Sequence, residues 1–412
     1  MNLVLFTSHY PFEGSNEQTF LKEEIQYLSK TFEHVILIPR TDTGKIISLP
    51  RNVSVEKTYA KFLENPIKAF VIPQLVFSPF FYREISRQLW LLFSPSSLFH
   101  LITFLGGAYL TQHWLVQWIN ERRINPKETI FYTYWFDQPA FGIGMTKRLF
   151  PDLKLVSRAH GYDLYPERYS PAYLPLRNEA FEMIDFLFPD SEIGTNYLVN
   201  QYPQFKTKFE TARLGVAESG FITNPSSDNV FRMVSCSLLV PVKRVNLLLD
   251  ALYLAAKMRP EQQFIWHHFG NGNTREVLQT YANENLPQNA RAYFPGYESN
   301  QALMNFYQNS PVDVFFNVSA SEGTPVAIME AISCGIPIIA TAVGGNQEIV
   351  SKENGWLLSA NPSPKEIAET MFQAIDNPEQ ASLKRQGSLS IWRKRYHAKT
   401  NFEDFIFRIK SL

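Results

Sequence analysis

The chain has few cysteines and no excess of charge of either sign. Its 412 residues include two cysteines, Cys236 and Cys334, both in apolar surroundings, which argues against a disulfide-stabilised secreted scaffold and predicts a cytoplasmic protein. Lysine plus arginine equals aspartate plus glutamate at 39 each, so any basic patch has to be local and a nucleic-acid partner is not expected.

Long apolar runs are also missing. No uninterrupted apolar stretch reaches the roughly 18 to 20 residues of a membrane span, which predicts a soluble or peripheral protein. The first residues lack a basic start and a long apolar region, so Leu3–Thr7 is interpreted as a buried strand rather than as part of a signal peptide. The region 62–119 is dense in aromatic and aliphatic residues. It is interpreted either as core helices or as a surface that contacts the inner membrane leaflet.

The length suits two domains of about 150 to 200 residues each. Apolar strands alternate with helical stretches in both halves, which predicts doubly wound, parallel α/β domains. A stretch rich in turn formers, 218–229, is the predicted linker between domains at 1–217 and 230–388, and 389–412 is predicted to be a helix.

The predicted elements follow from apolar periodicity. In the first half, helices are expected near 17–30, 97–121, 139–149 and 172–184. Strands are expected at Leu3–Thr7, Val35–Pro39, Thr129–Thr133, Leu153–Arg158 and Phe186–Pro189, and then at Phe231–Cys236, Gln263–Phe269, Arg291–Phe294, Val312–Phe316, Ile336–Ala340 and Gly355–Leu358.

The most informative segment is 319–350, SASEGTPVAIMEAISCGIPIIATAVGGNQEIV. Pro325 is predicted to begin a helix whose free amides Thr324 caps with its hydroxyl. Such a helix start attracts anions. Glu330 lies about 7 to 8 Å further along the axis at 1.5 Å per residue, roughly the step from a diphosphate to its ribose. This layout suits a sugar nucleotide, which calls for carboxylate acceptors, amide donors and a nearby cation.

The run E-G-x-P-x-x-x-M-E-A-x-x-x-G-x-P-x-I-A-T-x-x-G-G-x-x-E in this segment resembles the signature of the family-four glycosyltransferases, retaining enzymes of the GT-B fold. The resemblance implies two Rossmann-like domains that face each other across a cleft, with a final helix that crosses back to the first domain. It also implies that Glu322 orients the transferred sugar, that Glu330 holds the ribose, and that Gly323, Thr324 and Pro325 lie at the diphosphate.

A second part of the resemblance is the segment SCSLLVPVKR, in which Lys243 matches a lysine of the family. The match implies that Lys243 contacts the diphosphate and stabilises the leaving group. Ser237 stands where the family has an arginine, and Arg244 is the candidate to replace that cation, although a basic pair at a helix start is equally consistent with solvated surface.

Two loops of the second half have weaker signals. Gly270 and Gly272 resemble a glycine turn near the nucleotide, but a plain tight turn explains them too. Tyr297 is expected either to meet the base or to belong to an ordinary loop. His267 and His268 are adjacent on a strand and point to opposite faces, so they are not expected to bind a metal.

In the first half, the segment SRAHGYD resembles the His-Gly-x-Asp element on the acceptor side of the family. It implies that His160, Gly161 and Asp163 lie beside the transferred sugar, with Arg158 as a local cation, although a lone histidine is more often structural. Near the start, the loop with Gly14 and Glu17 is expected on the acceptor side. Glu17 is expected either to accept hydrogen bonds from sugar hydroxyls or to cap the next helix.

Taken together, the resemblance implies a retaining, metal-independent transferase without a cofactor. Its donor would be a UDP- or GDP-linked hexose or N-acetylhexosamine. The acceptor would be a glycan or an undecaprenyl-diphosphate-linked glycan, in bacterial capsule, exopolysaccharide or O-antigen synthesis at the cytoplasmic face of the membrane. Two alternatives stay open. One is another GT-B enzyme, a phosphorylase or a sugar-nucleotide epimerase. The other is a catalytically silent sugar-nucleotide-binding scaffold, suggested by Ser237.

Overall fold

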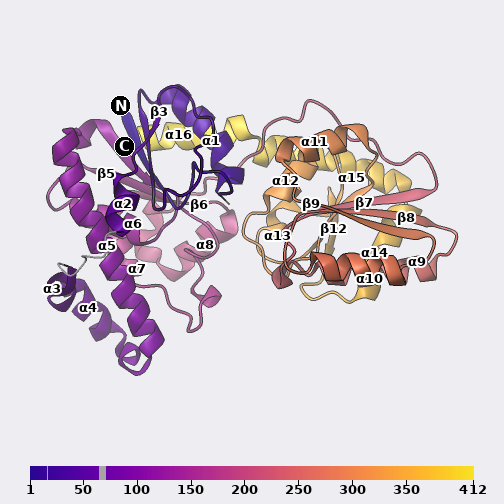
Figure 1. Ribbon diagram of the computed structural model, residues 1–412, viewed down its shortest axis with the longest axis horizontal. Helices are drawn as coiled ribbons and strands as arrows, with labels where there is room; N and C mark the ends of the chain where they lie inside the picture. Colours follow the sequence, from indigo (N-terminus) through magenta and orange to yellow (C-terminus); the bar gives the residue numbers. More distant parts are fainter. Residues whose placement is uncertain (16, 65–70) are drawn as a thin grey trace. The chain divides into compact units, whose positions relative to one another are not determined.

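The computed structural model describes residues 1–15, 17–64 and 71–412, and the chain divides into two compact units (Figure 1). Unit 1 comprises Met1–Arg213 and Thr400–Leu412, and unit 2 comprises Leu214–Lys399. Each unit contains one six-stranded sheet whose strands all pair in parallel, which confirms the predicted α/β class with two doubly wound sheets. Residues 218–229, the predicted linker, contain no helix or strand and lie within unit 2.

The sheet of unit 1 has the strand order β3-β2-β1-β4-β5-β6. Successive side chains on a strand point to opposite faces, so Val4 and Phe6 of β1 enter one core while Leu3 and Leu5 enter the other. The strands are β1 (Asn2–Thr7), β2 (Val35–Pro39), β3 (Val53–Val55), β4 (Thr129–Thr133), β5 (Lys154–Ala159) and β6 (Phe186–Pro189). All but the three-residue β3 were predicted, within one or two residues.

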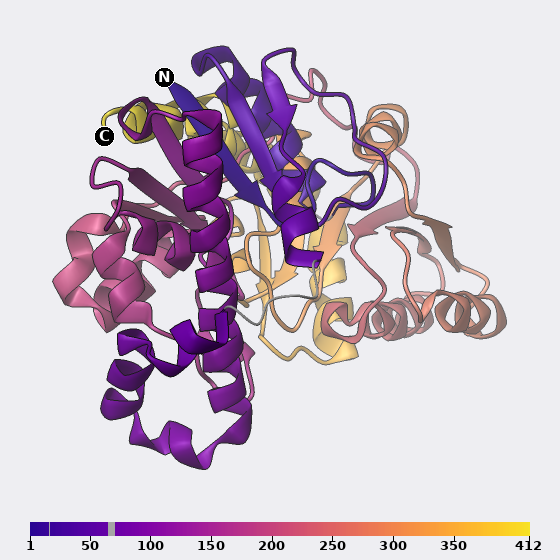
Figure 2. The same cartoon turned by 60° about the vertical axis from the view of Figure 1, so that its left-hand side comes forward.

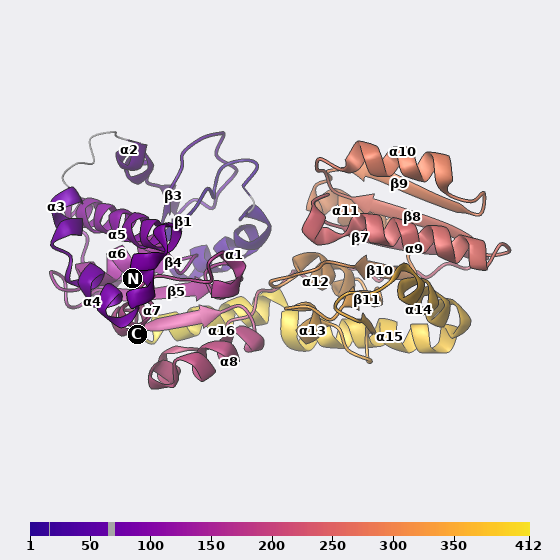
Figure 3. The ribbon, with the colours of Figure 1, turned by 90° about the horizontal axis from the view of Figure 1, so that it is seen from below.

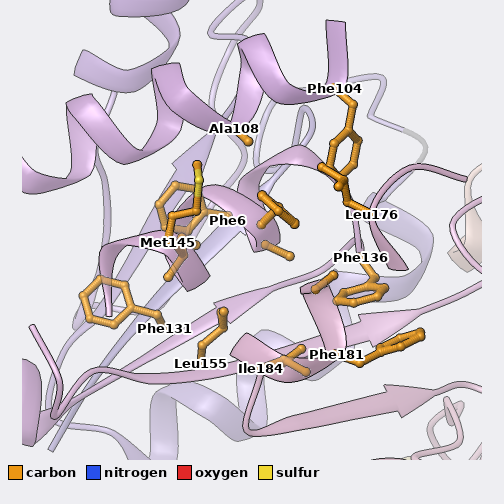
Figure 4. Close-up of a cluster of buried hydrophobic side chains, with 14 of the residues drawn as sticks. Phe6, Phe104, Ala108, Phe131, Phe136, Met145, Leu155, Leu176, Phe181 and Ile184 are labelled. Carbon is orange, nitrogen blue, oxygen red and sulfur yellow. The ribbon is translucent and has the colours of Figure 1, made fainter. Parts of the chain in front are cut away.

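One face of this sheet is covered by α5 and α6. Figure 4 shows the core that they form with the strands, which includes Phe6 and Phe131 of the strands and Phe104, Ala108 and Met145 of the helices. Fully burying one such side chain contributes about 1.5–3 kcal/mol. The helices of the N-terminal part are α1 (Gln18–Thr31), α2 (Thr58–Glu64), α3 (Val71–Val76), α4 (Pro79–Arg87), α5 (Pro95–Arg122), α6 (Gln138–Thr146), α7 (Arg177–Met183) and α8 (Glu192–Gln201).

The apolar region 62–119 is partly buried in the core and partly exposed, and its predicted contact with a membrane stays a prediction. From Leu101 onward, one side of α5 is buried in the core, whereas α3, α4 and the first turn of α5 carry exposed aromatic and aliphatic side chains. Figure 2 shows these segments extending beyond the sheet of unit 1. Residues 65–70 of this region lie outside the described residues. Across the described ranges, no helix combines the length and the apolar character that a membrane crossing requires.

The C-terminal stretch is not the single helix predicted at 389–412. It consists of α15 (Pro378–Ile391), a π-helical turn at Trp392–Tyr396 and α16 (Ala398–Lys410). Helix α16 packs with α1 on the second face of the unit 1 sheet, where the ring of Phe405 lies 5.4 Å from that of Tyr132 and 5.1 Å from that of Phe188. From Thr400 onward, helix α16 therefore belongs to unit 1 and covers one face of its sheet.

The sheet of unit 2 has the strand order β12-β11-β10-β7-β8-β9. Helices cover both of its faces, and α9 and α14 pack together on one of them (Figure 3). The strands are β7 (Val230–Cys236), β8 (Gln263–Phe269), β9 (Ala290–Gly296), β10 (Val314–Asn317), β11 (Ile338–Thr341) and β12 (Gly355–Leu358). Besides α15, the helices are α9 (Val245–Met258), α10 (Arg275–Asn285), α11 (Asn300–Asn309), α12 (Val326–Ser333), α13 (Asn346–Ile349) and α14 (Pro364–Asp376).

The two sheets share one topology. In unit 1 the order reverses between β1 and β4, and in unit 2 it reverses between β7 and β10. In open α/β sheets, ligands bind outside the carboxyl ends of the strands at such a reversal. The loops that follow these four strands are therefore the expected positions of ligand-binding residues.

Candidate active site

Lys243 and Glu322 meet at the strand reversal of unit 2. Lys243 follows β7 and Glu322 follows β10, and the Lys243 Nζ lies 2.6 Å from Glu322 Oε1. The same oxygen accepts hydrogen bonds from Asn317 Nδ2 at 3.0 Å and from Ser319 Oγ at 2.7 Å. The side chain of Glu322 is 8% exposed, so these charge-assisted bonds fix the orientation of a nearly buried carboxylate.

Helix α12 begins beside this pair, one residue later than predicted. Pro325 has ψ of 95° and occupies the N-cap position, so the first helical residue is Val326 and no side chain caps the helix. The prediction of Thr324 as the cap is wrong, because the extended Pro325 moves Thr324 out of reach. Its hydroxyl oxygen is buried without a hydrogen-bond partner among the described residues.

The first turn of α12 is consequently open to an anion. Within the described part of the chain, the amides of Val326 and Ala327 donate no hydrogen bond, whereas the next two amides bond to the Pro325 carbonyl. Free amides and the helix dipole together favour negative charge at this end.

Glycines hold the loop of Glu322 in place. A Cβ on Gly344 would lie 2.0 Å from the Glu322 carbonyl oxygen, and one on Gly345 would lie 2.1 Å from that of Gly323. The Gly344–Gly345 turn can therefore pack against this loop only without side chains. Gly344 also has φ of +46°. By contrast, a Cβ on Gly323 would meet nothing within 4 Å, so no contact within the described protein requires glycine there.

Glu330 lies in the second turn of α12 and is half-buried. Its Oε1 accepts a hydrogen bond from Asn300 Nδ2 at 2.6 Å, a partner that the sequence did not suggest. Burial raises the pKa of Glu330 to about 7, although the Asn300 bond acts in the opposite direction.

Arg244 is engaged by the protein rather than directed at a ligand. Its guanidinium donates to the carbonyls of Val318, Ser319 and Ala360 and to the side chain of Asn361, at 2.7 to 3.0 Å. These bonds tie the loop after β7 to the loop after β10. The prediction of Arg244 as a donor-binding cation in place of the missing arginine is therefore not supported by the structure.

Gly270 and Gly272 allow the loop after β8 to approach the loop after β7. Their Cβ atoms would lie 1.9 Å from the carbonyl oxygen of Ser237 and 2.3 Å from that of Leu239. His268 reinforces this contact, with Nε2 3.2 Å from the Ser237 carbonyl oxygen, and burial lowers its pKa to about 4.

Tyr297 is 76% exposed. Its predicted contact with a nucleotide base stays a prediction. Among the described residues, no group of three or more His, Cys, Asp or Glu side chains is placed to hold a metal ion.

In unit 1, Asp163 organises the loop of His160. Its carboxylate accepts from the His160 amide at 2.6 Å and from the Phe136 amide at 2.9 Å. Burial alone would raise the pKa of Asp163, but the His160 side chain and these amides outweigh it and lower the pKa. The His160 ring packs against the rings of both Tyr134 and Trp135, with centroids 4.7 and 4.5 Å away, and neither of its nitrogens has a hydrogen-bond partner among the described residues.

Arg158 corrects another prediction. Its guanidinium is fully buried on the α16 face of the sheet, where it pairs with Glu24 at 3.2 Å and donates to the Tyr132 hydroxyl at 2.9 Å. Arg158 lies within β5, whereas His160 comes directly after its end. The Arg158 side chain enters the core on the α16 face, where its guanidinium lies 4.2 Å from the ring of Phe405. It is a structural cation and not a residue on the acceptor side.

Glu17 has neither of the roles predicted for it. Its buried carboxylate accepts from the amides of Ser8, His9 and Tyr10 at 2.7 to 2.8 Å and from the indole nitrogen of Trp135 at 2.5 Å. It makes no side-chain cap of α1. Its carboxylate instead occupies the amides after β1, so these amides are not available to another anion.

The predicted place of Gly14 and Gly161 on the acceptor side stays a prediction. Gly14 has φ of +80° with open space around its Cα, and a Cβ on Gly161 would lie 2.5 Å from the guanidinium of Arg168.

A set of residues that the sequence analysis did not select lines a cavity of about 220 Å³ in unit 1. Arg40, Asp137 and Tyr162 come shortly after the carboxyl ends of strands, which is the signal that could have found them, and Asp163, which the sequence analysis selected, also lines the cavity. The set includes Arg40, Asp137, Gln138, Tyr162, Tyr169 and Arg177.

Comparison with known proteins agrees with this arrangement. Residues 221–388 match the family Glycosyl transferases group 1. The putative colanic acid biosynthesis glycosyltransferase WcaL of Escherichia coli (strain K12) is 23% identical over 245 residues, which cover 56% of this chain and 58% of that protein.

Solved structures also match over the whole chain, two of them as follows. The crystal structure of Anabaena Alr3699/HepE in complex with UDP and glucose has a TM-score of 0.65 at 17% identity and covers 100% of both chains. The apo form of the lipopolysaccharide outer core galactosyltransferase WaaB has a TM-score of 0.70 at 16% identity and covers 100% of this chain and 99% of that one. The second half of the chain is therefore a glycosyl transferases group 1 domain, and the whole chain has the GT-B fold of such glycosyltransferases.

Proposed function

We propose that this protein is a retaining glycosyltransferase that moves a hexose or N-acetylhexosamine from a nucleotide-diphosphate sugar to a glycan or lipid-linked glycan. The observation that carries the proposal is the Lys243–Glu322 pair beside the open start of α12, at the strand reversal of unit 2. Cation, free amides and an oriented carboxylate are the groups that a sugar diphosphate requires.

In this proposal unit 2 binds the donor. The amides of Val326 and Ala327 and the ammonium of Lys243 stabilise the charge that grows on the diphosphate as the bond from the sugar carbon to its oxygen breaks. Glu322 orients the hydroxyls of the transferred sugar, and Glu330 holds the ribose.

The acceptor oxygen bonds to the same sugar face, and its proton passes to the leaving phosphate, so no separate general base and no metal ion is required. The donor is UDP- or GDP-linked, and the UDP complex of HepE supports the uridine form.

Unit 1, with His160 near the transferred sugar, is proposed to bind the acceptor. The name of the WcaL relative supports a role in bacterial surface polysaccharide synthesis, with a glycan or an undecaprenyl-diphosphate-linked glycan as acceptor. This chain spans about three-fifths of that relative, and the proposal for the whole protein rests on the shared site chemistry.

A peripheral contact with the inner face of the cytoplasmic membrane is part of the proposal. The α3–α5 surface, defined here as the exposed apolar side chains from α3 to the start of α5, is shown by its helices in Figure 2. Its members include Val76, Phe77, Tyr82, Leu89, Trp90, Leu92, Phe93, Phe99 and Ile102.

The charges of this segment suit anionic lipid. Its exposed charged side chains are Arg83 and Arg87, each 45% exposed and each paired on one side with the buried Glu179, at 3.8 and 2.6 Å, while Glu84 is buried. Co-sedimentation with phosphatidylglycerol vesicles is expected to fall for Phe93→Ser and to stay unchanged for Phe407→Ser, a matched exposed phenylalanine on α16. Equal sedimentation of both variants with the wild type would remove the membrane contact.

A thermal-shift panel of UDP- and GDP-sugars tests the donor assignment. A ligand at about 100 times its Kd stabilises the folded state by about 2.7 kcal/mol, so the correct base and sugar are expected to give the largest shift. Nucleotide release is then measured with and without acceptor. Products formed in the absence of an acceptor would favour a phosphorylase or epimerase, and binding without turnover on any acceptor would favour a silent scaffold.

A further inference from the structure

The cavity of unit 1 lies where its fold favours a ligand. Ser8 directly follows β1, Arg40 directly follows β2, Asp137 follows β4 and Tyr162 follows β5, and all four line the cavity. The strand order reverses between β1 and β4, so the cavity occupies the carboxyl-end crevice of this sheet. Its volume of about 220 Å³ is below the 300–1,000 Å³ of sites for drug-sized molecules, which suits a single sugar ring.

Asp137 presents an unused carboxylate to this cavity. It occupies the N-cap position of α6, but its side chain makes no capping hydrogen bond. The nearest cation is Arg40, whose Nη1 lies 3.9 Å from Asp137 Oδ2, and within the described residues the carboxylate accepts no hydrogen bond. Burial raises the pKa of Asp137 to about 7, with Arg40 acting in the opposite direction and Asp163 and Glu17 adding to the rise. A carboxylate placed in this way is stabilised when a ligand donates to it.

The rest of the lining is aromatic, polar, apolar and charged. Its charged members are Asp163, whose carboxylate already accepts from two amides, and Arg177, which donates to the Asp163 carbonyl. Tyr162 packs on Trp135, with ring centroids 4.9 Å apart, and Tyr169 packs on His100 at 5.4 Å. The amide oxygen of Gln138 is held by Arg40 Nη2 at 2.7 Å. Aromatic faces that pack on C–H groups, next to a carboxylate and an amide that bind hydroxyls, match the chemistry of a neutral sugar.

We propose that this cavity is a sugar-binding subsite for the acceptor, in which Asp137 accepts hydrogen bonds from acceptor hydroxyls while Tyr162 and Tyr169 pack against the ring. The inference rests on the proposed function and names the substrate class of its acceptor side. It assigns Asp137 a role in acceptor binding and orientation, separate from the groups of unit 2 that meet the donor.

The test measures binding of simple sugars to the full chain. Methyl α-D-glucopyranoside, methyl α-D-galactopyranoside and methyl N-acetyl-β-D-glucosaminide are titrated by saturation-transfer NMR. The wild type is expected to bind at least one of them. Asp137→Asn and Tyr162→Ala are expected to weaken that binding roughly tenfold, ~1.4 kcal/mol. Asp152→Asn, which removes an aspartate that is 59% exposed in the same unit, is expected to bind as the wild type does.

The UDP- and GDP-dependent thermal shifts of the variants provide the second readout. They are expected to stay at the wild-type values, which also shows that each variant is folded. Unchanged glycoside affinity in Asp137→Asn, or no binding of any of the three glycosides by the wild type, would overturn the subsite. Glycoside binding that depends on Asp137 in a protein without nucleotide-sugar turnover would keep the subsite and reject the transferase.

Discussion

The two units have the same sheet topology, but the loops at their strand reversals differ in the groups that could bind an anion. In unit 1, the carboxylate of Glu17 occupies the amides of Ser8, His9 and Tyr10 directly after β1. In unit 2, the amides at the start of α12 are open and Lys243 stands next to them. In unit 1 the Glu17 carboxylate therefore occupies the amides that could bind a diphosphate, whereas in unit 2 the amides at the start of α12 are unoccupied by any described residue. In the proposed function, the same sheet topology serves a neutral sugar in unit 1 and a diphosphate in unit 2.

The largest expected effect comes from removing the charged pair of unit 2. Lys243→Ala and Glu322→Gln are expected to fold normally and to lower kcat for sugar transfer by about 10²–10³, the usual effect of deleting a group that stabilises transition-state charge. Nucleotide release with the identified donor and acceptor measures this. Lys365→Ala, which removes a lysine that is 70% exposed, is the control. Wild-type turnover in both site variants would show that the site is misplaced.

The corresponding change in unit 1 is expected to act on stability instead. Glu17→Gln weakens several charge-assisted hydrogen bonds to a buried group, which is expected to cost about 3 kcal/mol of unfolding free energy. Urea unfolding measures the loss, with the exposed Glu13→Gln as its control. A stable Glu17→Gln protein with weakened nucleotide binding would contradict the division of roles between the units.

Two glycines of unit 2 separate packing from ligand contact. Gly344→Ala is expected to destabilise by about 1–3 kcal/mol, because its Cβ would lie 2.0 Å from the Glu322 carbonyl oxygen. Gly323→Ala meets no protein atom and is expected to unfold like the wild type while binding the sugar nucleotide less tightly. Thermal unfolding and calorimetry distinguish the two. Full affinity in Gly323→Ala would place the diphosphate elsewhere.

The smallest effect is a pH dependence from Glu330. Burial raises its folded-state pKa from 4.5 to about 7, so the folded protein holds a proton that the unfolded chain releases. Stability from this group is present below about pH 4.5 and is lost as pH rises toward 7, by only a small amount because solvent screens a half-buried carboxyl. Glu330→Gln is expected to flatten that part of the unfolding free energy measured between pH 5 and 8. An unchanged slope would mean that the carboxyl is solvated in the folded protein.

The sequence predicted the strands and the site residues that local residue patterns determine. Apolar runs located eleven of the strands, and the resemblance of 319–350 selected Glu322, which the fold brings against Lys243 across 79 positions of the chain. The failures concern partners that lie far away in sequence. Arg158 is explained by Glu24, a pairing that no local pattern contains. Glu17 bonds both to the distant Trp135 and to the nearby amides of Ser8, His9 and Tyr10, which only the folded loop after β1 brings to it.

Backbone geometry limited the prediction as well. Thr324 is predicted as the N-cap of α12, but the N-cap is the next residue, Pro325. The backbone conformation of Pro325 depends on how its loop packs against Gly345, which the sequence does not reveal. Asp137 was missed for a different reason, since a single aspartate after a strand has no distinctive spacing until the cavity around it is seen.

The central claim is that the strand reversal of unit 2 binds a nucleoside diphosphate. Calorimetric titration of UDP and GDP into the wild type and Lys243→Ala tests it most directly. One of the two nucleotides is expected to bind the wild type and to lose roughly tenfold or more in affinity, ~1.4 kcal/mol, in Lys243→Ala. Equal affinity in both proteins, or no binding of either nucleotide to the wild type, would contradict the claim.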